Sequence, residues 1–196
     1  MKRTWLVLMK IALTVAAAIA VMAICPATAW AGGALIDFED LPSSPFESFT
    51  KSGVTFTAVD GGAMRGQDTP NGTIGLISNG PPFVELRADI IAGATSVSVD
   101  LGDYDMDSDR LFLEIFDASD VSLDFIDLVI PGSFTGMETL SLSNPNISYA
   151  IFGARDAVSG SSVFADNFEY VPEPAAFSLL ALGGLAVVRR KRRSRR

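Results

Sequence analysis

Histidine is absent from this chain of 196 residues. Without it the sequence lacks the commonest general base, the Ser-His-Asp and Cys-His catalytic arrangements, and the ligands of most zinc sites. It also has no glycine loop of the Walker or dinucleotide-binding kind, because the Gly61-Gly62 pair opens no helical segment. A glycosidase, which needs only two carboxylates, is the enzymatic alternative that these absences leave open.

Cysteine occurs once, as Cys25. It directly follows an apolar run over residues 11–24 and precedes a group of small residues. Three basic residues precede the run, and the order of basic, apolar and small residues is typical of a secretory signal peptide. We therefore expect signal peptidase to remove residues 1–31, cutting after Ala29 or Ala31. A retained N-terminal anchor helix is the alternative. Cleavage would remove the cysteine and leave a mature chain without disulfides.

Positive charge is scarce in the middle of the chain. Of the 15 Lys and Arg residues, three precede residue 32 and seven follow residue 188, so only five face 22 Asp and Glu over residues 32–171. The formal charge of this region is therefore −17. Such a domain is repelled by nucleic acid, and by anionic lipid or polysaccharide unless a cation intervenes. We expect no nucleic-acid partner.

Long hydrophobic runs and helical periodicity are missing from residues 32–171. Short runs rich in Val, Ile, Phe and Thr are bounded there by Gly, Pro, Asn or Asp, as in β-strands. They cover residues 35–39, 54–59, 73–77, 83–87, 96–101, 111–116, 121–128, 139–142, 148–152 and 163–170. Strands at roughly 10-residue spacing predict one all-β domain, a β-sandwich of the jelly-roll kind, with loops over the rest of 60–82.

The chain ends with three features in fixed order: Pro172-Glu173-Pro174, an uncharged apolar run over 175–188, and a basic cluster over 189–196. At about 1.5 Å per residue the run spans roughly 21 Å as a helix, short of a hydrocarbon core of about 30 Å. The cluster begins with Arg189, Arg190 and Lys191, whose long side chains reach the interface and stay on the cytoplasmic side. We expect a transmembrane segment. A C-terminal core helix with a solvated basic end is the alternative.

These 25 residues, 172–196, resemble the PEP-CTERM sorting signal of exosortase substrates in Gram-negative bacteria. The resemblance implies export, a transient inner-membrane intermediate, and removal of the tail by an exosortase near Pro172-Glu173-Pro174. It also implies a final location on the outer surface or in the extracellular matrix of a bacterium that makes exopolysaccharide. Because proteins of this class share the tail and differ in their bodies, the resemblance implies no biochemical activity.

The body also resembles surface proteins of this class. Its opening, Phe38-Glu39-Asp40-Leu41-Pro42 followed by Ser52-Gly53-Val54-Thr55-Phe56, is similar to theirs, and Val163 to Phe168 resembles their closing strand. This likeness implies a galactose-binding-type jelly roll. In jelly rolls of the carbohydrate-binding type a structural Ca²⁺ often lies between the first and last strands, and Glu39 and Asp166 occupy suitable positions here. Alternatively, these two acids are polar strand residues that face outward.

The densest group of acids is Asp103, Asp105, Asp107 and Asp109. With Glu114 they fall at positions 1, 3, 5, 7 and 12 of an EF-hand loop, and such oxygen donors suit Ca²⁺. Ser108 stands where that loop has glycine, and a strand over 111–116 leaves no exiting helix. We therefore keep open a Ca²⁺-binding loop between two strands and, as the alternative, a solvated acidic turn.

The sequence as a whole predicts an exported surface or extracellular-matrix protein without a catalytic role. A Ca²⁺-dependent polysaccharide-binding module is the alternative, and a carboxylate-dependent glycosidase is the third possibility.

Overall fold

A computed structural model describes residues 33–80, 84–103, 108–155 and 163–173. These residues form strands and connecting turns only. The strands are β1 (Ala34–Ile36), β2 (Ser48–Lys51), β3 (Val54–Ala58), β4 (Met64–Asp68), β5 (Ile74–Ser78), β6 (Leu86–Asp103), β7 (Asp109–Phe116), β8 (Ser122–Ile130), β9 (Gly136–Arg155) and β10 (Phe164–Pro172).

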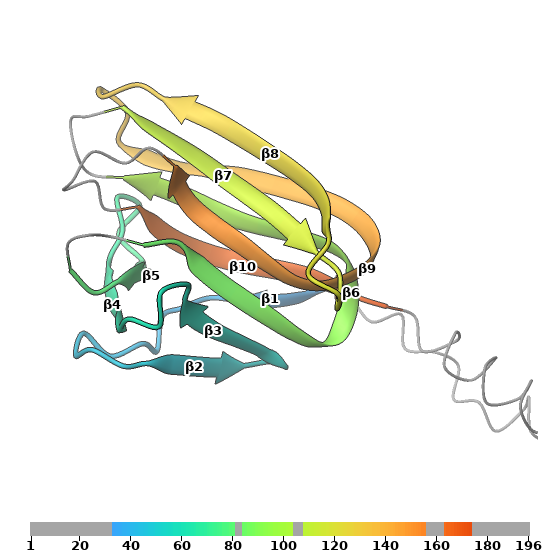
Figure 1. The fold of residues 1–196 in the computed structure, drawn as a ribbon. Helices are drawn as coiled ribbons and strands as arrows, with labels where there is room; N and C mark the ends of the chain where they lie inside the picture. Colours follow the sequence, from blue (N-terminus) through green and yellow to red (C-terminus); the bar gives the residue numbers. More distant parts are fainter. Residues whose placement is uncertain (1–32, 81–83, 104–107, 156–162, 174–196) are drawn as a thin grey trace, which may run out of the picture. The chain divides into compact units, whose positions relative to one another are not determined.

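The strands form two layers that share β6 and β9 (Figure 1). In the first layer the order is β2, β3, the first half of β6, the second half of β9, β7 and β8. In the second layer it is β4, β5, β10, the second half of β6 and the first half of β9, and β1 also pairs with β10. Hydrogen bonding thus continues from one layer to the other along the two long strands.

Both long strands bend where their ladder is interrupted. The register between β6 and β9 shifts from Asp89 to Ala94 and again from Ala94 to Ser96. On the β9 side, residues 144–146 have no partner in this ladder, and they include Pro145, which has no N–H to donate. Such bulges allow a strand to leave one layer and enter another.

The core lies between the layers and is rich in phenylalanine. The rings of Phe56 on β3 and Phe168 on β10 meet edge to face, with centroids 5.2 Å apart, and Phe152 on β9 lies 5.8 Å from Phe168. Phe38 completes the group at 5.1 Å from Phe56, and all four side chains are fully buried. Contacts between strands of different layers show that the layers pack face to face.

The prediction of an all-β domain with a sandwich-like arrangement is confirmed. The fold has two strands that the sequence did not predict, β2 and β4, and the second lies inside the predicted loop region 60–82. No helix in the described part of the chain is long and apolar enough to cross a membrane. The jelly-roll topology stays a prediction, as do the signal peptide at 1–31 and the membrane segment at 175–188, which lie outside the described residues.

Candidate functional site

The outer surface of the first layer carries two stacks of arginine on aromatic rings. In the first stack the guanidinium group of Arg87 on β6 lies 3.7 Å from the ring centroid of Tyr149 on β9. The Tyr149 ring is nearly parallel to that of Phe116 on β7, with centroids 4.7 Å apart. Asp89 fixes the arginine by accepting hydrogen bonds from Nε and Nη2, the latter over 2.7 Å. Such cation–π contacts stabilise by about 0.5–2 kcal/mol, depending on desolvation.

Tyr149 is held from its other end as well. Its hydroxyl donates to Asp120 Oδ1 over 3.0 Å. Burial raises the pKa of this hydroxyl, and the bond to Asp120 raises the pKa further, because it favours the protonated form. The tyrosine is therefore a fixed, neutral donor, and with 6% of its surface exposed its ring is not a free platform for a ligand.

The second stack lies on β7, β8 and β9. The guanidinium group of Arg155 lies 4.5 Å from the ring centroid of Phe112 and 4.4 Å from that of Phe125. Glu114 Oε2 pairs with Arg155 Nη2, and Glu114 Oε1 accepts a hydrogen bond from Ser122 over 2.8 Å. Phe112 is 1% exposed, whereas Phe125 is 37% exposed. Arg155 thus covers the buried ring of Phe112, and the partly exposed ring of Phe125 adds apolar area to the outer surface.

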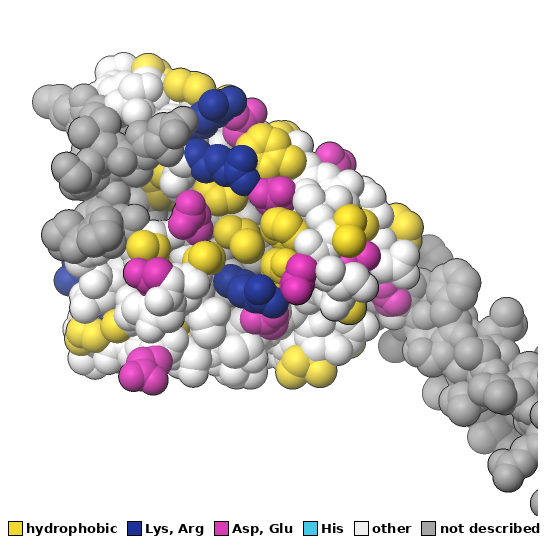
Figure 2. All heavy atoms as spheres, viewed as in Figure 1, with side chains coloured by type: hydrophobic (Ala, Val, Ile, Leu, Met, Phe, Trp, Pro, Cys, Tyr) yellow, Lys and Arg dark blue, Asp and Glu magenta, His cyan; other side chains and the backbone are white. Residues whose placement is uncertain are grey.

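We call these residues the arginine–aromatic face: Arg87, Tyr149, Phe116, Arg155, Phe112 and Phe125. Figure 2 shows basic, acidic and hydrophobic side chains intermixed on the side of the molecule where Figure 1 shows β7 and β8. Each arginine is paired with an acid, so the face is close to neutral although the domain is strongly acidic. It offers fixed hydrogen-bond donors and acceptors beside apolar area, which is the surface chemistry that binds polar, partly apolar molecules.

A second group of polar residues lies where β5 begins, and it includes Glu39 and Asp166, the two acids that the family resemblance assigned to a Ca²⁺ site. Asp166 on β10 is 2% exposed, and its Oδ2 accepts a hydrogen bond from Thr73 Oγ1 over 2.7 Å. Its Oδ1 accepts the Asn167 N–H over 2.7 Å. Glu39 Oε1 accepts the N–H of Ile74, next to Thr73, over 3.3 Å. Both acids therefore fasten the chain at the start of one strand.

The carboxylates of this group already accept hydrogen bonds from protein donors. Asp100 on β6, opposite Asp166 in the ladder, accepts bonds from Thr139 Oγ1 over 2.5 Å and from Asn167 Nδ2 over 2.9 Å. Asn167 itself has a φ of 46°, at the point where the ladder between β10 and β6 shifts register. Both oxygens of Asp166 are thus occupied by protein donors. Among the described residues, no three His, Cys, Asp or Glu side chains are placed to share one metal ion.

Burial raises the pKa of the Asp166 carboxyl above its ordinary value of 3.8. The bonds from Thr73 and Asn167 lower the pKa and oppose this effect, while the nearby charges of Asp100 and Glu39 raise it further. The native state therefore binds the Asp166 proton more tightly than the unfolded chain does. Linkage requires that this group's contribution to stability falls as pH rises from 3.8 through the raised value.

Replacing Asp166 by asparagine removes this pH-dependent loss. The amide keeps an oxygen for the Asn167 N–H and offers an N–H to Thr73 Oγ1, so the local bonds are preserved. We expect the free energy of unfolding of the wild type to fall, relative to that of Asp166→Asn, as the pH is raised through the acidic range. Urea unfolding of the two chains at a series of pH values measures the difference. Glu47→Gln, an exposed acid elsewhere, is the matched control. Parallel stability curves for wild type and Asp166→Asn would show that the effect is absent.

The acidic loop residues that are described lie on two strands. Asp103 ends β6 and Asp109 begins β7, and each is 1% exposed. Asp105 and Asp107 lie outside the described residues. Glu114 lies further along β7, on the outer surface, where it is engaged by Arg155 and Ser122. Because side chains alternate between faces along a strand, Glu114 and Asp109 point to opposite sides of the first layer.

The C-terminal tripeptide begins inside the sheet. Pro172 is the last residue of β10 and lies opposite Ala94 of β6. The N–H of Glu173 donates to the carbonyl of Gly93 over 3.4 Å, at the bend of β6. Gly93 has a φ of 71°, which favours glycine, and a Cβ there would lie 3.3 Å from the Glu173 carboxyl carbon. Pro174, the segment 175–188 and the basic residues Arg189, Arg190 and Lys191 lie outside the described residues.

Comparison with known protein families identifies the tail. The model of the PEP-CTERM protein-sorting motif matches residues 171–193, which confirms the resemblance predicted from the sequence. A motif of this kind marks an exported protein that passes through a membrane-anchored intermediate and is processed by an exosortase. The match covers the tail and the last residues of β10, and it says nothing of the activity of the body. No curated protein matches the chain.

Among solved structures, similarities to the body are distant. The K1 cleaved adhesin domain of Lys-gingipain from Porphyromonas gingivalis W83 matches with 12% identity and a TM-score of 0.49, over 72% of this chain and 99% of that one. The family 29 carbohydrate-binding module CBM29_1 from Piromyces equi matches with 6% identity and a TM-score of 0.38, over 71% and 90% of the two chains. The layered β fold described above is established by the strand pairing of this chain itself.

Proposed function

We propose that this protein is an exported surface or extracellular-matrix protein without a catalytic role, delivered by an exosortase. In this proposal, signal peptidase removes residues 1–31, the tail holds the chain in the inner membrane, and processing near Pro172-Glu173-Pro174 releases a jelly-roll domain to the outside. The sorting motif over residues 171–193 is the observation that carries the proposal. Its position supports the proposal too, because the tripeptide begins at Pro172, the last residue of β10, where the last strand of the body ends.

Pulse labelling of a Gram-negative host that makes exopolysaccharide tests this route. The labelled chain is expected first in the inner-membrane fraction and later, shortened, at the outer surface or in the matrix. A chain that remains in the cytoplasm, or that reaches the surface at full length, contradicts the proposal.

A second candidate function is Ca²⁺-dependent binding of exopolysaccharide, and the arginine–aromatic face favours it. Arg87 and Arg155 are fixed by stacking and by ion pairs, so little side-chain freedom is lost when they donate to sugar hydroxyls. The exposed edge of Phe125 supplies apolar contact. Because protein donors occupy Asp166, we place the calcium ligands in the acidic loop that begins at Asp103.

Retention of the full-length chain on immobilised neutral polysaccharides tests this function. Retention is expected in millimolar Ca²⁺ and is expected to be lost in EDTA at the same ionic strength. The double change Arg155→Gln and Phe125→Ala is expected to weaken it about tenfold or more, since buried and partly buried anchors carry most binding energy. Lys51→Gln, which removes a cation paired with Asp37 and Asp40, is the matched control. Equal retention of all three chains, or retention unchanged by EDTA, contradicts this second function.

A further inference from the structure

Arg65 on β4 differs from the other four basic residues in the described part of the chain. Each of those four forms an ion pair with an acid, whereas Arg65 has no acidic partner among the described residues. This is unexpected in a domain where 22 acids surround five bases. The Arg65 Nε atom is moreover buried, and it has no hydrogen-bond partner in the described structure. A buried N–H without an acceptor destabilises a protein, so this arrangement carries a cost in stability.

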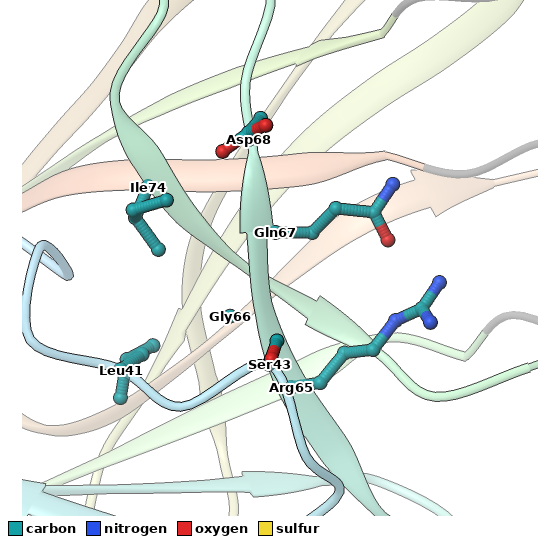
Figure 3. Close-up of a pocket in the computed structure, with 7 residues that line it drawn as sticks. All are labelled: Leu41, Ser43, Arg65, Gly66, Gln67, Asp68 and Ile74. Atoms are coloured by element: carbon teal, nitrogen blue, oxygen red, sulfur yellow. The ribbon is translucent and has the colours of Figure 1, made fainter.

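Arg65 lines a cavity at the edge of the second layer. The cavity has a volume of about 260 Å³ and is lined by Leu41, Ser43, Arg65, Gly66, Gln67, Asp68 and Ile74. Figure 3 shows Arg65 and Gln67 reaching out from β4 on one side of Gly66, with Leu41 and Ile74 on the other. Sites for drug-sized ligands measure about 300–1,000 Å³, so this cavity suits a molecule the size of one sugar ring.

The fold builds the cavity around a glycine. Gly66 donates its N–H to the carbonyl of Pro42 over 2.8 Å, which brings the segment after β1 against the edge of β4. A Cβ on Gly66 would lie 2.8 Å from Leu41 Cβ and 2.9 Å from the Leu41 carbonyl oxygen. Only glycine allows this close approach, so the positions of Leu41 and Arg65 relative to each other are fixed by the backbone.

The polar groups of the cavity select the chemistry of its occupant. A guanidinium group offers pairs of parallel N–H donors that match the two oxygens of a carboxylate. Because Nε of Arg65 is buried, the two Nη groups are the donors left to face the cavity. Gln67, Ser43 and Asp68 line the same space and supply donors and acceptors for hydroxyl groups. Ile74 adds a partly exposed apolar side chain to the lining, whereas Leu41 is 8% exposed and packs on the far side of Gly66 from Arg65. A hydroxylated ring that bears one carboxylate uses the guanidinium group together with these polar side chains.

We propose that the cavity at Arg65 binds a single hexuronate unit, either as a free sugar or as the end of an acidic glycan. The Arg65 guanidinium pairs with the carboxylate through its two Nη groups, and Gln67, Ser43 and Asp68 bond the ring hydroxyls. This site goes beyond the proposed function: it lies in the second layer, apart from the arginine–aromatic face, and requires neither sorting nor calcium.

Nuclear magnetic resonance of the ¹⁵N-labelled full-length chain in detergent micelles tests the proposal. Titration with D-galacturonate or D-glucuronate is expected to shift the Arg65 Nε–H resonance in a saturable way. D-galactose, which has a hydroxymethyl group in place of the carboxylate, and acetate, which has no ring, are expected to bind at least tenfold more weakly. An oligogalacturonide titrated in parallel distinguishes a chain end from a free sugar. An Arg65 resonance that does not move, or equal binding of galactose or acetate, overturns the proposal.

Two variants and a control separate the roles of charge and geometry. Arg65→Gln is expected to weaken uronate binding at least tenfold. Arg65→Lys keeps the charge but lacks the fork, and we expect it to weaken binding nearly as much. Arg110→Gln removes an equal charge from an ion pair with Asp127 on β8 and is expected to bind uronate as the wild type does. If Arg65→Gln fails to fold, the titration of the Arg65 Nε–H resonance in the wild-type chain still tests the proposal. Uronate binding that persists when polysaccharide retention or processing fails shows that this site is independent of them.

Discussion

Replacing Pro172 and Glu173 together by alanine is expected to leave the chain uncleaved and bound to the inner membrane. The expected change is close to all-or-none, because in the proposed route the exosortase processes the chain near this tripeptide, which lies inside the sorting motif over 171–193. The substitution should not disturb the body. Pro172 closes β10 opposite Ala94, a position that alanine can occupy in a strand, and neither side chain belongs to the hydrophobic core. Immunoblotting of membrane and exported fractions, with the apparent mass of each band, measures the outcome.

A matched control lies two residues before the motif. Glu169→Gln changes an acid in the same strand, paired with Leu35 of β1 and exposed to solvent, without touching the tripeptide. This variant is expected to be processed like the wild type. If the double alanine variant is also shortened and exported, recognition of the tripeptide is not what drives processing, and the motif does not act as proposed here.

Replacing Phe168 by alanine is expected to lower the free energy of unfolding by about 3–5 kcal/mol, as large aromatic truncations in cores do. Phe168 is fully buried on β10, and its ring meets Phe56 from the first layer and Phe152 from β9. Both partners belong to the first layer, so removing the Phe168 ring takes away contacts between the two layers. For a domain of this size the change corresponds to a fall in melting temperature of roughly 10–20 °C. Circular dichroism of the full-length chain during thermal and urea unfolding measures it.

Phe125→Ala is the control for this result. Phe125 also stacks on a ring, that of Phe112, but it is 37% exposed and lies on the outer surface. We expect its loss of stability to be no more than about a third of that for Phe168→Ala, since less area leaves water and little cavity forms. Equal losses for the two variants would mean that the contact between the layers does not dominate the stability of the fold.

The sequence predicted strands where apolar and polar residues alternate. The runs predicted over 54–59 and 111–116 overlap β3 and β7, because Val54, Phe56, Leu111 and Leu113 point to the core in the expected period of two. It did not predict β4, whose Arg65-Gly66-Gln67-Asp68 stretch has no apolar alternation and becomes a strand by pairing with β5. The pairing with β5, and not alternation within the segment itself, supplies this information.

The two long strands were each predicted as two short ones. Gly93 in β6 and Asn144-Pro145-Asn146 in β9 have the composition of turns, and turns were the expected structure there. In the folded chain both segments lie at bulges in a ladder that continues on either side, so the strands bend and go on. The residues correctly indicated a bend in each segment. They did not show that the strand continues beyond the bend, because that depends on pairing in the folded chain.

The candidate sites were predicted unequally. The tail was identified because three properties follow one another in a fixed order. The approach of Glu39 and Asp166 came from resemblance, and the structure places both beside the start of β5. The stacking of Arg87 on Tyr149 depends on strand register. The lack of an acidic partner for Arg65 within the described ranges depends on where every acid lies in the folded chain. Phe112, Glu114 and Phe116 alternate along β7, and this is the signal in the sequence that points to the arginine–aromatic face.

The intact mass of the native protein isolated from the outer surface or matrix tests the central claim most directly. If the chain is exported and processed by an exosortase, the mass is that of a chain without the N-terminal residues 1–31 and without the basic cluster over 189–196, with a new C-terminus near Pro172-Glu173-Pro174. A mature exported protein whose mass still includes Arg189 to Arg196 would contradict the account.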